Sequence, residues 1–282
     1  MKLCRYGKPG YEKPGLIDTE GRLRDLSKVV DNIGPNEISP RGLKMLSRVK
    51  PETLPPVNGG PRLGVPYVGI GKFVAIGLNY SDHAKEAGLP IPSEPIVFMK
   101  ATTCISGPGD DVIQPKNSTK LDWEVELGVV IGSQARYVDE AAALGHVAGY
   151  CIVNDVSERA FQMATTQWDK GKGFDTAGPI GPWLVTTDEI RDPQTLNMAL
   201  EVNGKRMQTG NTRTMVFSVA KIISHVSQYM TLLPGDIIAT GTPPGVGLGI
   251  KPTPVFLKPG DVMQLTIHGL GQQRQKVVAF SA

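Results

Sequence analysis

The stretch LDWEVELGVVI, residues 121–131, decides which fold this chain can adopt. From Trp123 onward, apolar side chains stand at every second position, and Glu124, Glu126 and Gly128 stand between them. Residues two apart lie on the same face of a β-strand, so this period predicts a strand with both carboxylates on one face. The apolar residues around them indicate a central, buried strand, where two adjacent acids need a chemical reason.

Short apolar strands and a few helices surround this stretch. We expect further strands at 73–77, 96–99, 150–153, 236–239, 262–267 and 276–280. We expect helices at 139–144, 157–165 and 218–229, the last of them capped by Ser218. Because strands outnumber helices and do not alternate with them regularly, the pattern argues against a Rossmann sheet or a (β/α)₈ barrel. The predicted fold class is α+β and β-rich.

Residues 1–65 are interpreted as a small N-terminal α/β domain, and residues 66–282 as the main domain. Strands and one helix are expected within the small domain, at 1–6, 14–17 and 38–49. Proline and glycine crowd residues 51–66, so we place the linker there.

Composition and charge narrow the range of partners. The chain has 282 residues, of which 40% are hydrophobic, and a formal net charge of +3. This balance suits a globular protein and gives no reason to expect nucleic acid or an acidic membrane as a partner. No stretch approaches the roughly 20 apolar residues of a membrane helix, and the start lacks the apolar run of a signal peptide. The sparse, odd set of cysteines indicates reduced thiols and a cytoplasmic protein: Cys4, Cys104 and Cys151.

Asp155 gives the two glutamates a chemical interpretation. On their own, Glu124 and Glu126 could face water or pair with Lys and Arg neighbours. Asp155 follows a second apolar strand, Tyr150–Val153, closely. Three carboxylates from two strands form an all-oxygen site that suits Mg²⁺, with Mn²⁺ or Ca²⁺ as substitutes, whereas zinc more often takes His or Cys ligands. A cation would balance the remaining negative charge, and Lys172 is the candidate.

A second cluster, GLNYSDHAKE at residues 77–86, comes at the end of an apolar strand. It predicts a short helix capped by Ser81 or Asp82. His83 and Glu86 are three residues apart and can touch on one face of that helix. A carboxylate that orients an imidazole makes it a base able to activate water. An ordinary His–Glu pair on a surface helix fits the same spacing.

The loop Gly241–Gly245 follows a predicted strand. Its backbone N–H groups and the Thr242 hydroxyl could bind a carboxylate, although a plain turn fits the sequence as well. Neither the glycine-rich segment Gly245–Gly249 nor Gly171–Phe174 has the spacing of a nucleotide-binding loop, so nucleotide binding is rejected.

Together, these segments resemble the fumarylacetoacetate hydrolase family. The matching motifs occur in order as GLNYSDHAKE (77–86), LDWEVELG (121–128), NDVSER (154–159), KGFDT (172–176) and GTPPGVG (241–247). The resemblance covers about residues 72–282. It implies a catalytic domain of the family's mixed β-roll or sandwich type, and a homodimer.

The resemblance also implies a role for each residue. The metal ligands would be Glu124, Glu126 and Asp155. The catalytic residues would be Lys172 and a water-activating dyad of His83 and Glu86, which a lid covers. Substrate contacts are expected from Gln162, Arg159, Thr242, Asn79 and Tyr80.

The implied reaction is metal-dependent hydrolysis of the C–C bond of a 2,4-diketo acid, which gives pyruvate and a second carboxylic acid. The amino-terminal part resembles a bacterial subgroup that acts on sugar acids such as 2,4-diketo-3-deoxy-L-rhamnonate. The same site could serve oxaloacetate decarboxylation, hydroxyheptadienedioate isomerisation or ureidoglycolate cleavage. A metal-binding scaffold without chemistry is the non-enzyme alternative, and the presence of His83, Glu86 and Lys172 speaks against it.

Overall fold

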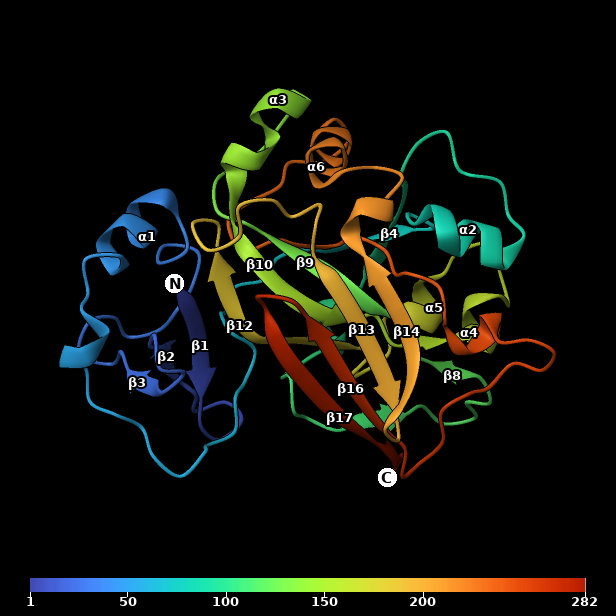
Figure 1. The fold of residues 1–282 in the computed structure, drawn as a ribbon, viewed down its shortest axis with the longest axis horizontal. Helices are drawn as coiled ribbons and strands as arrows, with labels where there is room; N and C mark the ends of the chain where they lie inside the picture. Colours follow the sequence, from blue (N-terminus) through green and yellow to red (C-terminus); the bar gives the residue numbers. More distant parts are fainter. Residues whose placement is uncertain (282) are drawn as a thin grey trace.

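A ten-stranded mixed sheet runs through the centre of the computed structural model, which describes residues 1–281 (Figure 1). The strand order is β3-β2-β1-β12-β10-β9-β15-β4-β5, with β6 attached to β12. The bounds are β1 (Lys2–Tyr6), β2 (Lys13–Ile17), β3 (Leu23–Asp25), β4 (Phe73–Gly77), β5 (Ile96–Lys100), β6 (Ile105–Ser106), β9 (Val125–Ile131), β10 (Val147–Asn154), β12 (Gly178–Thr186) and β15 (Ile237–Ala239). β15 runs parallel to β4, and β6 runs parallel to β12.

A second sheet of five strands packs against the first, in the order β14-β13-β16-β17-β7. The bounds are β7 (Val112–Gln114), β13 (Asn197–Val202), β14 (Lys205–Asn211), β16 (Val262–Ile267) and β17 (Gly271–Ala279). Figure 1 shows most of this sheet in front of β9, β10 and β12. β16 alternates buried and half-buried residues because one of its faces meets the core, whereas β9 is buried at every position. The core between the sheets includes Leu127, Ile152 and Leu265.

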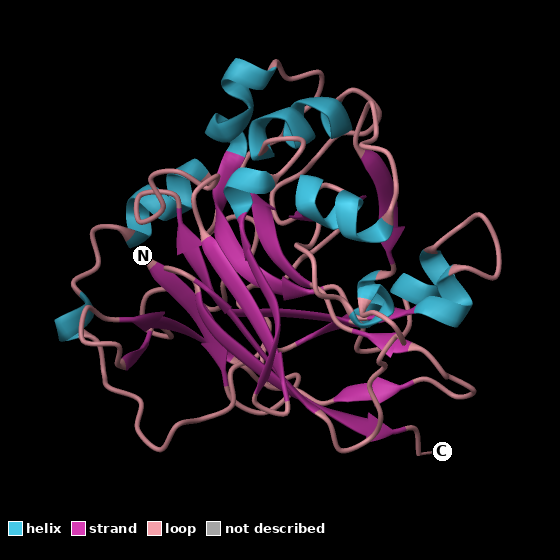
Figure 2. Cartoon of the chain, turned by 45° about the vertical axis from the view of Figure 1, so that its right-hand side comes forward, coloured by secondary structure: helices cyan, strands magenta, loops and turns pink. Residues whose placement is uncertain are grey.

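The helices are short and lie around the edges of the sheets (Figure 2). They are α1 (Pro40–Leu46), α2 (Ser81–Ala87), α3 (Glu140–Ala143), α4 (Arg159–Gln162), α5 (Asp169–Lys172) and α6 (Val219–Ser227). Single 3₁₀ turns occur at Pro51–Thr53, Thr102–Cys104, Leu144–His146, Thr212–Thr214 and Gly247–Gly249. β8 (Leu121–Asp122) and β11 (Ser157–Glu158) form a separate two-stranded ladder next to α4. No helix within residues 1–281 is both long enough and apolar enough to cross a bilayer.

The predicted β-rich α+β class is confirmed, and Ser218 caps α6 as expected by accepting the Lys221 N–H. Two local predictions were wrong. The helix expected over 157–165 is restricted to α4, because its first two residues pair with β8 instead. The residue that precedes α2 is Tyr80, without a side-chain cap, so neither Ser81 nor Asp82 caps that helix.

The amino-terminal strands join the central sheet at its edge (Figure 1, blue). β1 pairs with β12, where Lys2 lies opposite Val185 and Leu3 opposite Leu184. Backbone hydrogen bonds therefore run without a break from β3 to the strands of the main domain. The division at residue 65 stays a prediction about folding units.

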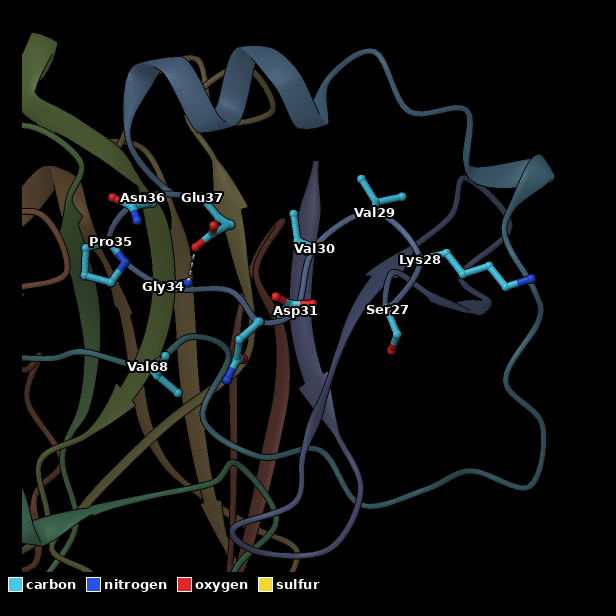
Figure 3. Close-up of a pocket in the computed structure, with 11 residues that line it drawn as sticks. Ser27, Lys28, Val29, Val30, Asp31, Gly34, Pro35, Asn36, Glu37 and Val68 are labelled. Atoms are coloured by element: carbon cyan, nitrogen blue, oxygen red, sulfur yellow. Dashed lines mark hydrogen bonds between the residues drawn. The ribbon is translucent and has the colours of Figure 1, made fainter.

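A cavity of about 550 Å³ lies in this amino-terminal part (Figure 3). Residues of the 27–37 loop and Val68 form its wall. Glu37 accepts a hydrogen bond from the Gly34 N–H at 2.9 Å, which holds the loop in shape. None of the predicted catalytic or metal-binding residues lines this cavity, so the candidate active site lies elsewhere.

Candidate active site

Strands β9 and β10 bring the three predicted metal ligands together. Glu124 immediately precedes β9, Glu126 lies within it, and Asp155 immediately follows β10. The two strands are antiparallel neighbours, and the Asp155 N–H donates to the Glu124 carbonyl at 3.0 Å. All three residues are buried, and one carboxylate oxygen from each lies within 4.8 Å of the other two.

Three cations contact two of these carboxylates. Lys172 Nζ lies 2.7 Å from both Glu124 Oε2 and Asp155 Oδ2. Arg159 donates to Glu124 Oε1 at 2.6 Å, and Lys100 donates to Asp155 Oδ1 at 2.5 Å. Burial opposes ionisation of Glu124, but Lys172 and Arg159 outweigh it and lower the pKa of this carboxyl. Glu124 is therefore ionised at neutral pH.

Glu126 is the exception among the three acids. In the described chain its carboxylate receives one hydrogen bond, from the Gly241 N–H at 2.8 Å, and takes part in no ion pair. Burial, together with Asp155 and Glu124, raises the pKa of Glu126 well above its ordinary value. A divalent cation on the three carboxylates would supply the missing positive charge, so this donor set fits a hard metal ion.

The environment of the acids decides between the two alternatives that the sequence left open. A wet strand face is wrong, because Glu124, Glu126 and Asp155 are all buried. Pairing with Lys and Arg applies to Glu124 and Asp155 but leaves Glu126 without a cation.

Close packing of α5 on α4 brings Lys172 to the acids. A Cβ on Gly171 would stand 2.4 Å from the Gln162 backbone nitrogen, so only glycine allows this approach. Burial alone would lower the pKa of Lys172, but Asp155 and Glu124 raise it. The ammonium is therefore charged at neutral pH, as the predicted charge-balancing role requires.

His83 and Glu86 form the predicted pair on α2. His83 Nδ1 lies 3.0 Å from Glu86 Oε2. Because a carboxylate only accepts hydrogen bonds, Nδ1 is the donor, and in the neutral form of the imidazole Nε2 has the lone pair. The Gly245 N–H donates to Glu86 Oε1 at 3.0 Å, which ties the helix to the loop after β15. The pair lines the same cavity as the acids, and this favours a catalytic base over an ordinary surface pair.

One cavity of about 610 Å³ contains both groups. The charged part of its wall consists of the three acids, the His83–Glu86 pair, Lys172, Arg159 and Lys251. Much of the remaining wall is apolar and comes from Leu78, Leu89, Ile96, Phe98, Met163, Trp168 and Leu248. The cavity therefore has room for a small organic acid with a polar end and an apolar end.

Arg159 and Gln162 line the cavity, but they differ in what they can offer a substrate. Arg159 donates to Asp122 at 2.8 Å, to Glu124, and to Gln162 Oε1 at 3.0 Å. Three of its five N–H groups are used within the protein and hold the acids in place, and the predicted substrate contact stays a prediction. The Gln162 oxygen faces Arg159, which leaves its amide N–H groups for a ligand.

Thr242 also lines the cavity, but its hydroxyl is already used. It donates to the Val125 carbonyl at 2.9 Å and accepts from Gln208 at 2.8 Å. The hydroxyl therefore cannot donate to a substrate carboxylate, contrary to expectation. The backbone N–H of Thr242 has no partner in the described part of the chain and can take that role.

Asn79 and Tyr80 are buried outside the cavity wall, which corrects the prediction that they contact substrate. Asn79 accepts from the Phe217 N–H and donates to the Thr240 carbonyl, both at 2.8 Å. The Tyr80 hydroxyl lies 3.2 Å from Met198 Sδ. Both residues fix the segment between β4 and α2 to neighbouring parts of the fold.

Two charged residues of the site were not predicted. Lys100 is buried at the end of β5 and donates to Asp155 and to the Lys172 carbonyl. Asp122 accepts from Arg159 and from the Gly247 N–H, the latter at 2.6 Å. A charge at the end of an apolar strand had singled out Asp155, and the same signal could have found Lys100.

Comparison with known proteins identifies the family. Residues 72–278 match the family model described as fumarylacetoacetate hydrolase, C-terminal. A protein named "putative hydrolase" from Burkholderia multivorans is 60% identical over 276 residues, which are 98% of each chain. The chain therefore belongs to the fumarylacetoacetate hydrolase family, as the sequence motifs predicted.

Two solved structures share this fold over almost the whole chain. The fumarylacetoacetate hydrolase of Exiguobacterium antarcticum is 36% identical, with a TM-score of 0.89, over 99% of this chain and 100% of that one. The 2-hydroxyhepta-2,4-diene-1,7-dioate isomerase of Mycobacterium marinum is 32% identical, with a TM-score of 0.75, over 100% of both chains. The family fold thus carries both hydrolase and isomerase names among its solved members.

Proposed function

We propose that the protein is a magnesium-dependent hydrolase that cleaves the C–C bond of a 2,4-diketo acid. One observation carries this proposal: the buried cluster of Glu124, Glu126 and Asp155 shares a cavity with the His83–Glu86 pair. Metal ligands and a base that face one space are the groups that hydrolysis at a keto acid requires. The hydrolase name of the Burkholderia relative supports it.

Substrate binding starts at the acid cluster. A divalent cation held by Glu124, Glu126 and Asp155 would act as a Lewis acid toward the carboxylate and 2-keto oxygens of the substrate. The Thr242 N–H and the Gln162 amide, both on the cavity wall, donate to the substrate carboxylate and orient it.

His83 activates the water molecule. Its Nε2 takes a proton from water while Glu86 stabilises the imidazolium that forms, and the hydroxide adds to the C4 carbonyl carbon. The segment 81–92 carries this pair, and we propose that it acts as a lid that excludes bulk water.

Collapse of the C4 adduct breaks the C3–C4 bond. The electron pair of that bond stays on C3 as pyruvate enolate, and C4 becomes the carbon of a carboxylic acid. The Lys172 ammonium compensates the charge of the enolate. The proton held by His83 then moves to C3, so one water is consumed and the products are pyruvate and a second carboxylic acid.

The same groups suit other reactions that pass through an enolate. The likeness to the Mycobacterium marinum isomerase favours keto–enol isomerisation as the second candidate. Oxaloacetate decarboxylation and ureidoglycolate cleavage are further alternatives. Hydrolysis is preferred because the Glu86-supported base can activate water, which none of these alternatives requires.

We also propose a cytoplasmic location and a homodimer. The three cysteines are free and buried, which suits a reducing compartment. The dimer rests on the family resemblance, and light scattering of the purified protein tests it.

Product analysis tests the reaction. Protein stripped of metal with a chelator is given acetylpyruvate, a 2,4-diketo-3-deoxy sugar acid, oxaloacetate and ureidoglycolate, each with and without Mg²⁺. We expect pyruvate and a second acid from the diketo acids only when Mg²⁺ is present. Turnover of oxaloacetate alone, or no metal-dependent turnover of any compound, would contradict the proposal.

His83→Ala tests the base. Its kcat should fall about 100- to 10,000-fold because water loses its proton acceptor. Calorimetry should show unchanged Mg²⁺ binding, since His83 is not among the three acids. His268→Ala, at an exposed histidine outside this cavity, is the matched control. Unchanged turnover by His83→Ala would refute the assigned role.

A further inference from the structure

We infer that the acyl group of the substrate, the part that begins at C4, is an alkyl or aromatic group rather than a polyhydroxylated or carboxylated chain. This inference rests on the proposed function and adds the chemical class of the acyl group to it. Its basis is the part of the cavity wall that the catalytic groups leave free.

Two aromatic rings form the inner part of that wall. Phe98 on β5 and Trp168, which precedes α5, meet edge to face with ring centroids 5.2 Å apart. A Cβ on Gly77, at the end of β4, would stand 2.7 Å from the Trp168 ring, so glycine at this position makes room for the indole. Lys172 Nζ lies 5.2 Å from the Phe98 ring centroid, so the aromatic wall begins beside the acid cluster.

Aliphatic side chains continue the wall toward solvent. Leu89, Met163 and Leu248 line the same cavity and are 53%, 71% and 37% exposed. They come from three separate segments, which follow α2, α4 and β15. Large apolar side chains exposed along a cavity are covered when a ligand of matching polarity binds. An apolar acyl group that extends from Trp168 past these residues provides that cover.

Charged groups are scarce on this part of the wall. The charged groups near the acid cluster have been described above. Beyond them, Lys251 is the one charged residue that the described chain places along the cavity. Lys251 is exposed and forms no ion pair among the described residues. A chain of hydroxyl groups would lose its water here and find few partners, which disfavours its binding. A second carboxylate would find only Lys251, and an ion pair with this exposed, hydrated ammonium contributes little.

A substrate series with the Mg²⁺-loaded enzyme tests the inference. Acetyl-, butanoyl- and hexanoylpyruvate lengthen the apolar group, and benzoylpyruvate, fumarylpyruvate and a 2,4-diketo-3-deoxy sugar acid complete the set. We expect kcat/KM to rise about threefold for each added methylene. We expect fumarylpyruvate and the sugar acid to stand at least about tenfold below hexanoylpyruvate.

The outcomes separate the inference from the proposed function. A flat or falling series, or a preference for the sugar acid or fumarylpyruvate, overturns the inference and leaves C–C hydrolysis standing. If the Mg²⁺-loaded enzyme cleaves none of the diketo acids, both the inference and the proposed function are overturned.

Variants of the wall add a second readout. Trp168→Ala should lower kcat/KM for hexanoylpyruvate about tenfold more than kcat/KM for acetylpyruvate, mainly through KM. Leu89→Ser should also lower kcat/KM more for hexanoylpyruvate than for acetylpyruvate. Because Leu89 is exposed, a loss of activity in this variant would not be due to misfolding. Trp183→Phe, at a tryptophan outside the cavity, is the control. If Trp168→Ala and Leu89→Ser each lower kcat/KM equally for hexanoylpyruvate and acetylpyruvate, the inference is overturned.

Discussion

Two clusters of acidic and basic side chains, one built around Arg5, Glu12 and Arg62 of the amino-terminal part and one at the active site, balance their charges differently. In the first, Arg62 reaches Asp110 at 2.5 Å and Glu12 at 3.0 Å, and Arg5 reaches Glu12 at 3.2 Å. Each of these carboxylates meets a guanidinium. At the active site, Glu126 is buried beside two other acids and forms no ion pair in the described chain.

This difference separates charges that hold the fold from charges that serve a reaction. Arginine–carboxylate pairs with several hydrogen bonds are complete in themselves and stabilise the packing of the segments they join. A buried carboxylate without a cation lowers stability, and such groups persist where a bound ligand compensates them. Glu126 is therefore the residue that points most directly to a metal ion.

Glu126→Gln should give the largest effect and separate stability from activity. Without metal, the change removes a carboxyl whose ionisation is opposed by burial and by Asp155 and Glu124, so the free energy of unfolding should rise by about 1 kcal/mol. The same change removes a metal ligand, so Mg²⁺-dependent kcat/KM should fall more than about 100-fold. Urea unfolding in the presence of a chelator and steady-state kinetics measure the two quantities.

Glu124→Gln is the matched control for that variant. It removes the charge that Arg159 and Lys172 contact, so the free energy of unfolding should fall by about 3 kcal/mol. If Glu126→Gln destabilises the protein as much as Glu124→Gln does, then the contrast between the two carboxylates is wrong.

Lys100→Met should have the next largest effect, on stability first. The substitution leaves the buried Asp155 with one cation instead of two and removes the donor to the Lys172 carbonyl. We expect the free energy of unfolding to fall by about 3 kcal/mol and kcat to fall about tenfold. Lys276→Met, at an exposed lysine on β17, should stay within about 0.5 kcal/mol of the wild type. Equal unfolding midpoints for both variants would show that Lys100 does not support the site.

Much of the site could be predicted because its signals are local. A period of two places Glu124 and Glu126 on one face, and a charge after an apolar strand singles out Asp155. A spacing of three joins His83 to Glu86 on one helix face. Each of these relations spans only a few residues, so the sequence itself contains it.

The remaining features depend on segments that are distant in the chain. The use of the Thr242 hydroxyl by Gln208, and of the Arg159 donors by Asp122, follows from tertiary packing. The same holds for the aromatic wall, where Trp168 meets Phe98 across 70 positions of sequence. Spacing rules cannot find such partners.

Strand β12 shows the same limit at the level of the fold. Its sequence GPIGPWLVT has two glycines and two prolines, which local rules assign to turns. It is nevertheless a largely buried strand between β1 and β10, and its register with β10 shifts between Tyr150 and Ile152. The irregularity lets a proline-containing segment occupy a central place in the sheet.

Asp18 belongs to a second arginine–carboxylate group of the amino-terminal part, with Arg22 and Arg24 as its partners. It gives the smallest effect and tests whether carboxylates in this part are balanced by arginine. The N–H groups of Glu20 and Arg22 donate to its Oδ1 at 3.0 and 2.8 Å, and Arg24 donates to Oδ2 at 2.8 Å. Burial acts in the opposite direction, but these bonds lower the pKa of Asp18 to about 2 from an ordinary 3.8. Because the pKa is lower in the folded state, the stabilisation is complete above about pH 4 and is lost as the pH falls toward 2.

Asp18→Asn removes the ionised form at every pH. We expect the variant to unfold at a lower temperature than the wild type at neutral pH, and the gap to close between about pH 4 and pH 2. Thermal unfolding across this range measures the gap, and Asp31→Asn, at an exposed carboxylate, should show none. A gap that stays constant down to pH 2 would mean that hydrogen-bond geometry, and not charge, holds this turn. The amino-terminal part would then no longer serve as the charge-balanced counterpart of the active site.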